Sequence, residues 1–304
     1  MNACATLQWL RVCAPIACLC AVHAAHAAHA MLVPEGAVTL VRATTVYEVD
    51  APFAIEPGDL LATGLHASAQ IEYDDGSIAA LAADTRLAMD APPRGATAAP
   101  ADSLSLLRGW IKVTRTHAAS GALSIETTAW RAALSDGSAV VHADAGVVSL
   151  FMENGGMALS LSERGQHPQL LSGERYVQRA QRDAGKPLDT QPRPAPDFIA
   201  AMPVPFRDPL GSIARRTALK DKALTQGRVA SYADIGDWLT ISLAVRRTFV
   251  ARFRPLAQAQ PFRAQVQEHL RDLPDWRRVL CPPPEPRGRR TSAPTEARTS
   301  EEQS

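Results

Sequence analysis

The chain has 304 residues, of which 46% are hydrophobic, and a formal net charge of +1. Four of its five cysteines lie within the first 20 residues. Cys281 is therefore left alone in the rest of the chain, which excludes an internal disulfide there and leaves stability to the hydrophobic core. After the first thirty residues, no stretch is long and apolar enough for a membrane span.

The N-terminal residues 1–30 have the features of a secretory signal peptide. Residues 12–22 form an apolar run too short to span a bilayer, and small residues follow it in the pattern that signal peptidase cleaves. Cleavage is predicted after Ala27 or Ala30, which places the protein in the periplasm or outside the cell. Translation from Met31 would instead give a cytosolic product.

Residues 31–181 are typical of short β-strands. Segments such as 37–49 and 104–116 are rich in β-branched and aromatic residues, and glycines or Asp-Gly pairs separate the segments. We therefore predict a mainly β fold of stacked hairpins, arranged as a sandwich or a solenoid. About 150 residues are enough to bury a core without disulfides.

The sequence Asp-Gly-Ser occurs twice in this region, and its first copy is Asp75-Gly76-Ser77. Asp-Gly between apolar strands favours a type I′ hairpin, because glycine adopts a positive φ freely and aspartate tolerates one. We predict such a bend at Asp75-Gly76 and another at Asp136-Gly137. A catalytic serine would need a base within hydrogen-bond reach, and a calcium loop would need alternating acidic ligands. Neither pattern surrounds the two copies.

Prolines mark the end of the β region. Four of them fall within 183–196, which favours an extended, semi-rigid chain. We predict a Pro-rich linker over 182–206, a basic helical region over 207–281 and a disordered tail over 282–304.

Two helices are predicted in the basic region. Apolar residues recur at three- and four-residue intervals over 234–253, which indicates one helix that Ser231 or Asp234 caps and Pro255 ends. A shorter helix follows, with Pro261 in its first turn.

The two parts of the chain carry opposite charge. Residues 31–180 hold 10 Lys and Arg against 17 Asp and Glu, whereas residues 207–280 hold 14 against 7. This asymmetry suggests that the two parts dock on each other or that the basic part meets an anionic partner. The candidate partner-binding residues are Arg246, Arg247, Arg252 and Arg254.

A series of short motifs resembles the periplasmic domain of the FecR family. "IEPGDLLATG" provides Gly58, Asp59, Thr63 and Gly64 for the family's signature of Gly-Asp, a hydrophobic residue and a following threonine. The first Asp-Gly-Ser provides the hairpin, and "LLRGWIKV" places Gly109 in a Leu-x-x-Gly-x-hydrophobic-x-Val strand. The resemblance covers about residues 32–180. All of these residues are expected to shape turns and strands rather than to contact a ligand.

The resemblance implies an all-β, non-enzymatic module of the cell envelope. FecR regulators that restrain sigma factors carry a cytoplasmic N-terminal domain and a membrane span before this module, whereas this chain has a leader in their place. The resemblance therefore does not extend to the relay of a signal across the inner membrane. This chain also has Thr128 where the family has proline.

No other chemistry is indicated. The histidines that follow the leader are scattered singly, without the spacing or cysteine partners of a metal site, and no phosphate-binding loop is present. We expect no catalytic residue, metal or cofactor, and no nucleic-acid partner. The expected function is binding or signalling toward an envelope protein or polymer. The alternatives are a peptidoglycan or glycan adaptor and, with the least support, a hydrolase using Asp75 and Ser77.

Overall fold

The computed structural model describes residues 30–90, 102–116, 119, 121–144, 146–161, 167–183, 185–214, 222–241 and 243–281. The predicted leader, except for Ala30, and the predicted tail lie outside these residues. Both stay predictions. Among the described residues, no helix is long and apolar enough to cross a membrane.

The described residues contain a strand-rich part followed by a helical part, which confirms the mainly β prediction. The strands before the helical part are β1 (Ala30–Glu35), β2 (Val38–Arg42), β3 (Thr45–Val49), β4 (Phe53–Ile55), β5 (Leu60–Thr63), β6 (Ser68–Tyr73), β7 (Ile78–Leu81), β8 (Arg86–Met89), β9 (Ser103–Arg115), β10 (Leu123–Glu126), β11 (Trp130–Asp144), β12 (Val147–Leu161), β13 (Gln169–Ser172), β14 (Arg175–Ala180) and β15 (Thr190–Gln191). The later elements are α1 (Pro196–Ala201), β16 (Arg228–Val229), α3 (Tyr232–Thr240), α4 (Arg246–Phe253), α5 (Gln260–Glu268) and α6 (Arg277–Leu280), with short 3₁₀ turns between some of them.

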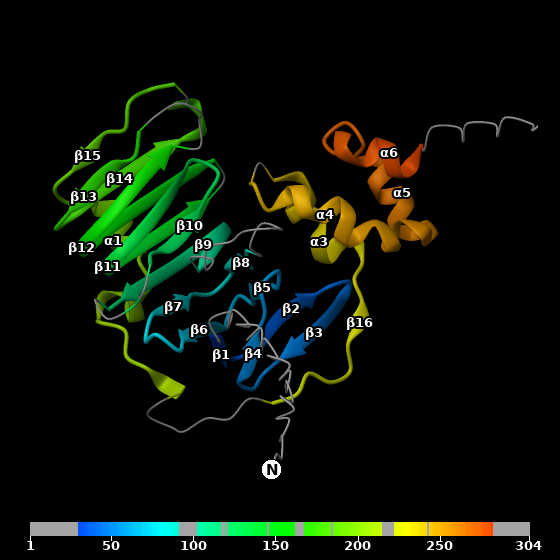
Figure 1. Ribbon diagram of the computed structural model, residues 1–304, viewed down its shortest axis with the longest axis horizontal. Coiled ribbons are helices and arrows are strands. Elements are labelled where there is room, and N and C mark those ends of the chain that lie inside the picture. Colours follow the sequence, from blue (N-terminus) through cyan, green and yellow to red (C-terminus); the bar gives the residue numbers. More distant parts are fainter. Residues whose placement is uncertain are drawn as a thin grey trace, which may run out of the picture.

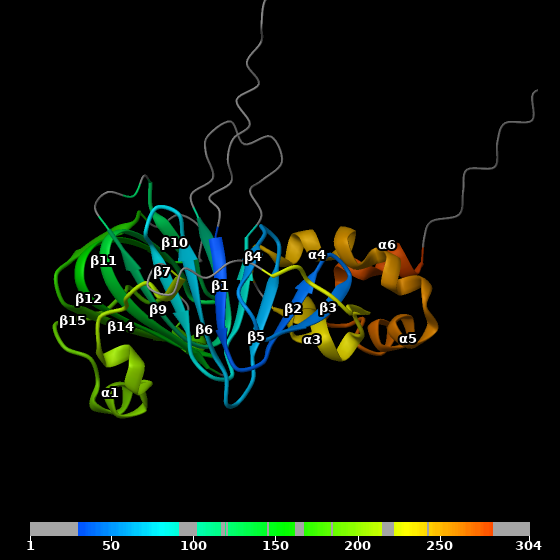
Figure 2. The same ribbon diagram turned by 90° about the horizontal axis from the view of Figure 1, so that it is seen from below.

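The strands form one mixed sheet that curves around a common core (Figures 1 and 2). Most neighbours are antiparallel, but β9 and β10 pair in parallel. Side chains alternate as a half-buried sheet requires: in β11, Trp130, Ala132 and Leu134 are buried and the residues between them are not. The core takes residues from the early and the late strands alike, so the two halves of the sheet pack on each other.

Gly109 lets β9 pair with different strands before and after this position. The residues before it pair with β8, and the residues after it pair with β7 and β11. Its φ is +93°, and a Cβ there would lie 2.5 Å from Thr85 Oγ1. Only glycine combines this backbone conformation with so close an approach.

The second Asp-Gly-Ser is not a turn, so that prediction was wrong. Asp136 and Gly137 lie inside the long strand β11, opposite Gly156 and Gly155 of β12, where the register shifts. Gly137 and Gly155 both have positive φ, as expected at a β-bulge. The Gly155-Gly156 pair lies inside the strand β12. The local turn signal did not decide the structure here, because the segments before and after Asp136-Gly137 form one long strand that pairs with β12.

Part of the predicted linker is folded against the sheet. Residues 196–214, called the strap below, bury Phe198, Met202 and Phe206 on the outer face of the sheet, next to Tyr176 and Val140. Figure 2 shows α1 on this side, away from the other helices. The proline content does favour extended chain, but the three large apolar residues between the prolines provide a face that the sheet can bury.

Two buried charged side chains hold the strap. Lys112 Nζ in β9 donates to the carbonyls of Phe206 and Asp208 at 2.8 and 3.0 Å and pairs with Glu153 at 2.9 Å. Glu72 in β6 accepts from the backbone N–H groups of Ile213 and Ala214, at 2.5 and 2.9 Å. Buried charges require such partners.

The helix predicted over 234–253 is two helices, α3 and α4, with a break between them. Ile241 and Leu243 explain the break. In one continuous helix their side chains would point about 160° apart, at 100° per residue, and could not share a buried face. The break allows both to be buried. The expected start at Ser231 is confirmed: its backbone N–H donates to Asp234 Oδ2 at 2.7 Å. Pro261 lies in the first turn of α5, as predicted.

The helical part docks on one end of the sheet, beside β2 and β3 (Figures 1 and 2). Its core joins Trp238, Phe249 and Phe253 to Val41 and Leu60 of the strands in one cluster. The two oppositely charged parts of the chain therefore touch, and the contact is mainly apolar.

Candidate functional site

The first Asp-Gly-Ser is the bend between β6 and β7, as predicted, but not as a type I′ turn. Gly76 N–H donates to the carbonyl of Tyr73 at 2.9 Å, and Gly76 alone in the bend has a positive φ, +85°. Ser77 is buried, and its Oγ accepts from Arg115 at 3.0 Å. Arg115 also pairs with Asp75 at 3.3 Å. A guanidinium keeps its proton, so Arg115 cannot be the base that activates Ser77. Its hydrogen bond to Ser77 and its ion pair with Asp75 instead stabilise the bend.

The Gly-Asp-x-x-x-Thr-Gly signature forms another internal corner. Asp59 is 1% exposed and accepts from Arg42 through both carboxylate oxygens, at 3.0 and 2.6 Å. This bond raises the pKa of Arg42. Gly58 N–H donates to Met89, and Thr63 Oγ1 donates to Ala82 and accepts from Thr85. The carbonyl of Gly64 accepts from two backbone N–H groups. These residues hold strands together, and none of them lines a cavity described below.

Arg252, a predicted partner-binding residue, forms its hydrogen bonds within the protein. Its Nε and Nη2 donate to the carbonyls of Ala43 and Val41, both at 2.8 Å, and its Nη1 donates to Gly58. Burial lowers the pKa of Arg252 to about 10. The side chain therefore clamps α4 to the sheet. Arg254, after α4, is exposed and lines neither cavity described below.

The other two predicted arginines, Arg246 and Arg247, line a cleft between the end of the sheet and the helices. This arginine cleft has a volume of about 730 Å³. Its apolar wall includes Leu161, Ile241 and Leu243. Its polar side chains are Glu126, Arg131, Ser160, Arg246, Arg247 and Asp275.

Guanidinium groups outnumber carboxylates in the arginine cleft. Glu126 pairs with Arg131 at 2.7 Å and also accepts from the backbone N–H of Ala244 at 3.1 Å. Asp275 lies 3.4 Å from Arg246, which also donates to a backbone carbonyl. Arg247 is exposed and has no ion pair within the described part of the chain. The cleft thus offers unused donors in the geometry that suits carboxylate or phosphate.

Sequence reasoning missed Glu126, Arg131 and Asp275 at this cleft. Glu126 and Arg131 face each other across the β10–β11 hairpin. An acidic and a basic residue five positions apart, around a short turn, could have indicated this pair. Nothing local in the sequence brings that hairpin to α4.

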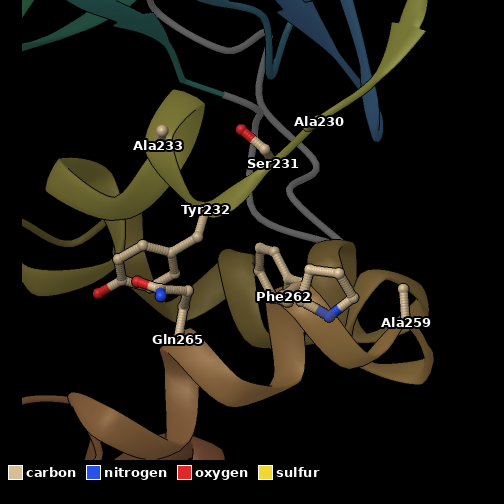
Figure 3. Close-up of a pocket in the computed structure, with 8 residues that line it drawn as sticks. Ala230, Ser231, Tyr232, Ala233, Ala259, Phe262 and Gln265 are labelled. Atoms are coloured by element: carbon tan, nitrogen blue, oxygen red, sulfur yellow. The ribbon is translucent and has the colours of Figure 1, made fainter.

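A second hollow, of about 410 Å³, lies between the start of α3 and the start of α5 (Figure 3). Tyr232, Phe262 and Gln265 point into it, and its lining is mostly apolar. It has no charged side chain, so it is a weaker candidate for a polar ligand. Within the described residues, no group of three or more His, Cys, Asp or Glu could hold a metal ion.

The fold and its sites define a mainly β protein with a helical appendage, whose signature residues brace the sheet. Residues 59–157 match the family model described as FecR protein. The chain thus carries a FecR domain, as the sequence motifs predicted. The match covers β5 to β11 and the first part of β12, and leaves the helical part outside.

Among the solved structures that resemble the chain are two of a protein from Parabacteroides distasonis ATCC 8503 assigned as an anti-sigma factor. The TM-score is 0.35 for each, at 13% and 12% sequence identity. Each match covers 43% of this chain and 58% of that chain, so a little over half the length of those proteins is spanned. None of the curated proteins compared with the chain matches it.

Proposed function

We propose that the chain is an exported, non-enzymatic binding module of the cell envelope, and that its arginine cleft binds an anionic group on an envelope protein or polymer. The observation that supports this proposal most directly is that Arg246 and Arg247 line one cleft together with Arg131, which lies in the region that matches the FecR model. A FecR domain supports a regulatory or signalling role for such binding.

The balance of charge in the cleft supports an anionic ligand. Arg247 is free to form a two-pronged bond with a carboxylate or phosphate, and Arg131 uses only one of its Nη atoms on Glu126. Charge-assisted bonds of this kind are about twice as strong as neutral ones. The apolar wall would exclude water from one side of the ligand.

Export by a cleaved leader is part of the proposal, and Ala27 is the favoured cleavage site. Strand β1 begins at Ala30, which pairs with Ile55 and Tyr73. Cleavage after Ala27 keeps this strand whole, whereas cleavage after Ala30 removes its first residue. N-terminal sequencing of the exported protein distinguishes the two.

Co-sedimentation with purified peptidoglycan sacculi, and photo-cross-linking from the cleft in intact cells, test the ligand. We expect Arg247→Ala to weaken binding about tenfold, while Arg254→Ala, an exposed arginine outside the cleft, leaves binding unchanged. Sedimentation with sacculi would favour the adaptor alternative, and a cross-linked envelope protein would favour signalling. Equal binding by both variants would contradict the proposal.

The hydrolase alternative has no support from the geometry. Ser77 is buried under Arg115, and a nucleophile needs a base and access to substrate.

A further inference from the structure

The two walls of the arginine cleft come from different parts of the molecule. Arg131 lies in β11 of the sheet, whereas Arg246 and Arg247 begin the helix α4. The complete cleft therefore exists only while the helical part is docked on the sheet.

The arginines of the cleft form their bonds within their own walls. Arg131 pairs with Glu126 on the sheet side at 2.7 Å, and Arg246 donates to the carbonyl of Asp272 on the helical side at 3.0 Å. A hydrogen bond from the Ala244 N–H to Glu126, at 3.1 Å, connects the two walls. A ligand that contacts guanidinium groups of both walls would add a second polar connection.

The charges of the cleft favour an anion between the walls. Three guanidinium groups line the cleft, and the carboxylates of Glu126 and Asp275 offset them only in part. Like charges on the two walls repel each other, whereas an anion between them removes the repulsion and forms charge-assisted bonds to both. Arg247 is exposed, and Arg131 uses only one of its Nη atoms on Glu126, so both walls have donors for such bonds.

A carboxylate is the anion that the cleft already accommodates. Glu126 Oε2 accepts from Arg131 Nη2 at 2.7 Å, and Asp275 lies 3.4 Å from Arg246. The apolar part of the lining, which includes Leu161, offers contacts to an apolar side chain beside the carboxylate. An acidic segment of a protein supplies both kinds of group.

We propose that an acidic segment of a partner protein bridges the two walls, with carboxylates on Arg131 and Arg247, and thereby locks the helical part on the sheet. This inference rests on the proposed function, because it names the ligand of the same cleft and the consequence of its binding. A ligand that needs both walls binds only the docked state and stabilises it by mass action. A ligand held by one wall alone would bind the docked and undocked states equally and shift nothing.

Hydrogen exchange with a defined probe tests the bridge. The probe is hexaglutamate, whose six residues span about 20 Å when extended, and its dissociation constant is first measured for each variant by calorimetry. At ten times that constant, we expect exchange of peptides from 232–280 to slow about tenfold. Peptides from 169–180, which do not line the cleft, should exchange as before.

Arg131→Gln separates a bridge from binding by α4 alone, and its amide keeps a donor for Glu126. This variant should bind hexaglutamate about tenfold more weakly. At ten times its own dissociation constant, the protection of peptides from 232–280 should fall to about twofold or less. Arg254→Ala, the matched control outside the cleft, should keep both the affinity and the protection.

Four results would each overturn the inference. They are protection that persists in Arg131→Gln, no protection in the unaltered chain, no binding of hexaglutamate at millimolar concentration, and tighter binding of tripolyphosphate than of hexaglutamate. The last result would indicate a phosphate polymer instead of an acidic protein segment.

The inference and the proposed function fail in different ways. If Arg247→Ala weakens binding to the envelope fraction but hexaglutamate gives no protection, the function stands and the inference is wrong. If hexaglutamate protects the helices through Arg131 but Arg247→Ala binds the envelope fraction as the unaltered chain does, the proposed function is wrong and the bridge stands.

Discussion

At positions 137 and 155, β11 and β12 cross so closely that neither residue can carry a side chain. A Cβ on Gly137 would lie 2.3 Å from the carbonyl oxygen of Asn154, and a Cβ on Gly155 would lie 2.1 Å from that of Asp136. Both distances are far below van der Waals contact. The two glycines allow the long strands to bend together, so that their two ends serve different parts of the curved sheet.

Gly137→Ala should therefore destabilise the protein strongly. The left-handed backbone alone costs a residue with a Cβ about 1–2 kcal/mol, and the overlap with β12 adds to it. We expect a loss of about 3 kcal/mol or more, seen as a fall in Tm of about 6–12 °C, measured by circular dichroism. Gly58→Ala is the matched control, because Gly58 has a φ of +95° but nothing within 4 Å of the added Cβ. Equal shifts for the two variants would show that the close crossing is unimportant.

At the scale of elements, polar contacts with the sheet hold the short strap in place. Burial opposes the charge on Glu72, but hydrogen bonds from Ser212, Ala214 and Ile213 outweigh it and lower the pKa of Glu72 below its ordinary 4.5. The ionised form is therefore favoured in the folded chain. Its contribution is fully present above pH 4.5 and is lost as the pH falls through the lowered folded value.

This linkage predicts a pH-dependent difference between the protein and its Glu72→Gln variant. At pH 6 the variant should melt at a lower temperature, because a neutral amide accepts these hydrogen bonds less well. Below pH 4.5 the difference should shrink as Glu72 is protonated in the unaltered chain. Thermal melts from pH 3 to pH 6 measure it, and a constant difference across that range would contradict the assignment.

The elements show what the sequence could and could not predict. Alternation and turn residues were enough for the mainly β class, for the bend at Gly76 and for the start of α3 at Ser231. The turn predicted at Asp136-Gly137 was wrong, because a local turn signal cannot reveal that both flanking segments pair along their length with one neighbouring strand. Only part of the arginine cleft could be predicted. The sequence singled out the arginines of α4, but the β10–β11 hairpin that completes the cleft is more than one hundred residues away in the chain.

At the scale of the whole molecule, the docking of the helices on the sheet follows burial rather than net charge. One apolar cluster spans the contact. An ion pair joins the two parts, between Arg86 of β8 and Asp237 of α3 at 2.5 Å. In this pair the sheet supplies the cation, although the sheet carries the negative net charge. Arg252 reaches carbonyl oxygens and not carboxylates. The opposite net charges of the two parts therefore do not determine this contact.

Arg252→Ala should loosen the helices without disturbing the strands. The change leaves three carbonyl groups without their donor, and those of Val41 and Gly58 are partly buried. An unsatisfied buried group costs about 1–3 kcal/mol. With a net loss of about 3 kcal/mol, hydrogen exchange of peptides from 232–280 should speed up by about 100-fold, whereas peptides from 123–161 should exchange as before. Arg254→Ala controls for the loss of one positive charge beside α4. If exchange increased equally in both regions, the helices and the sheet would unfold as one unit, and Arg252 would stabilise the whole molecule rather than one docking contact.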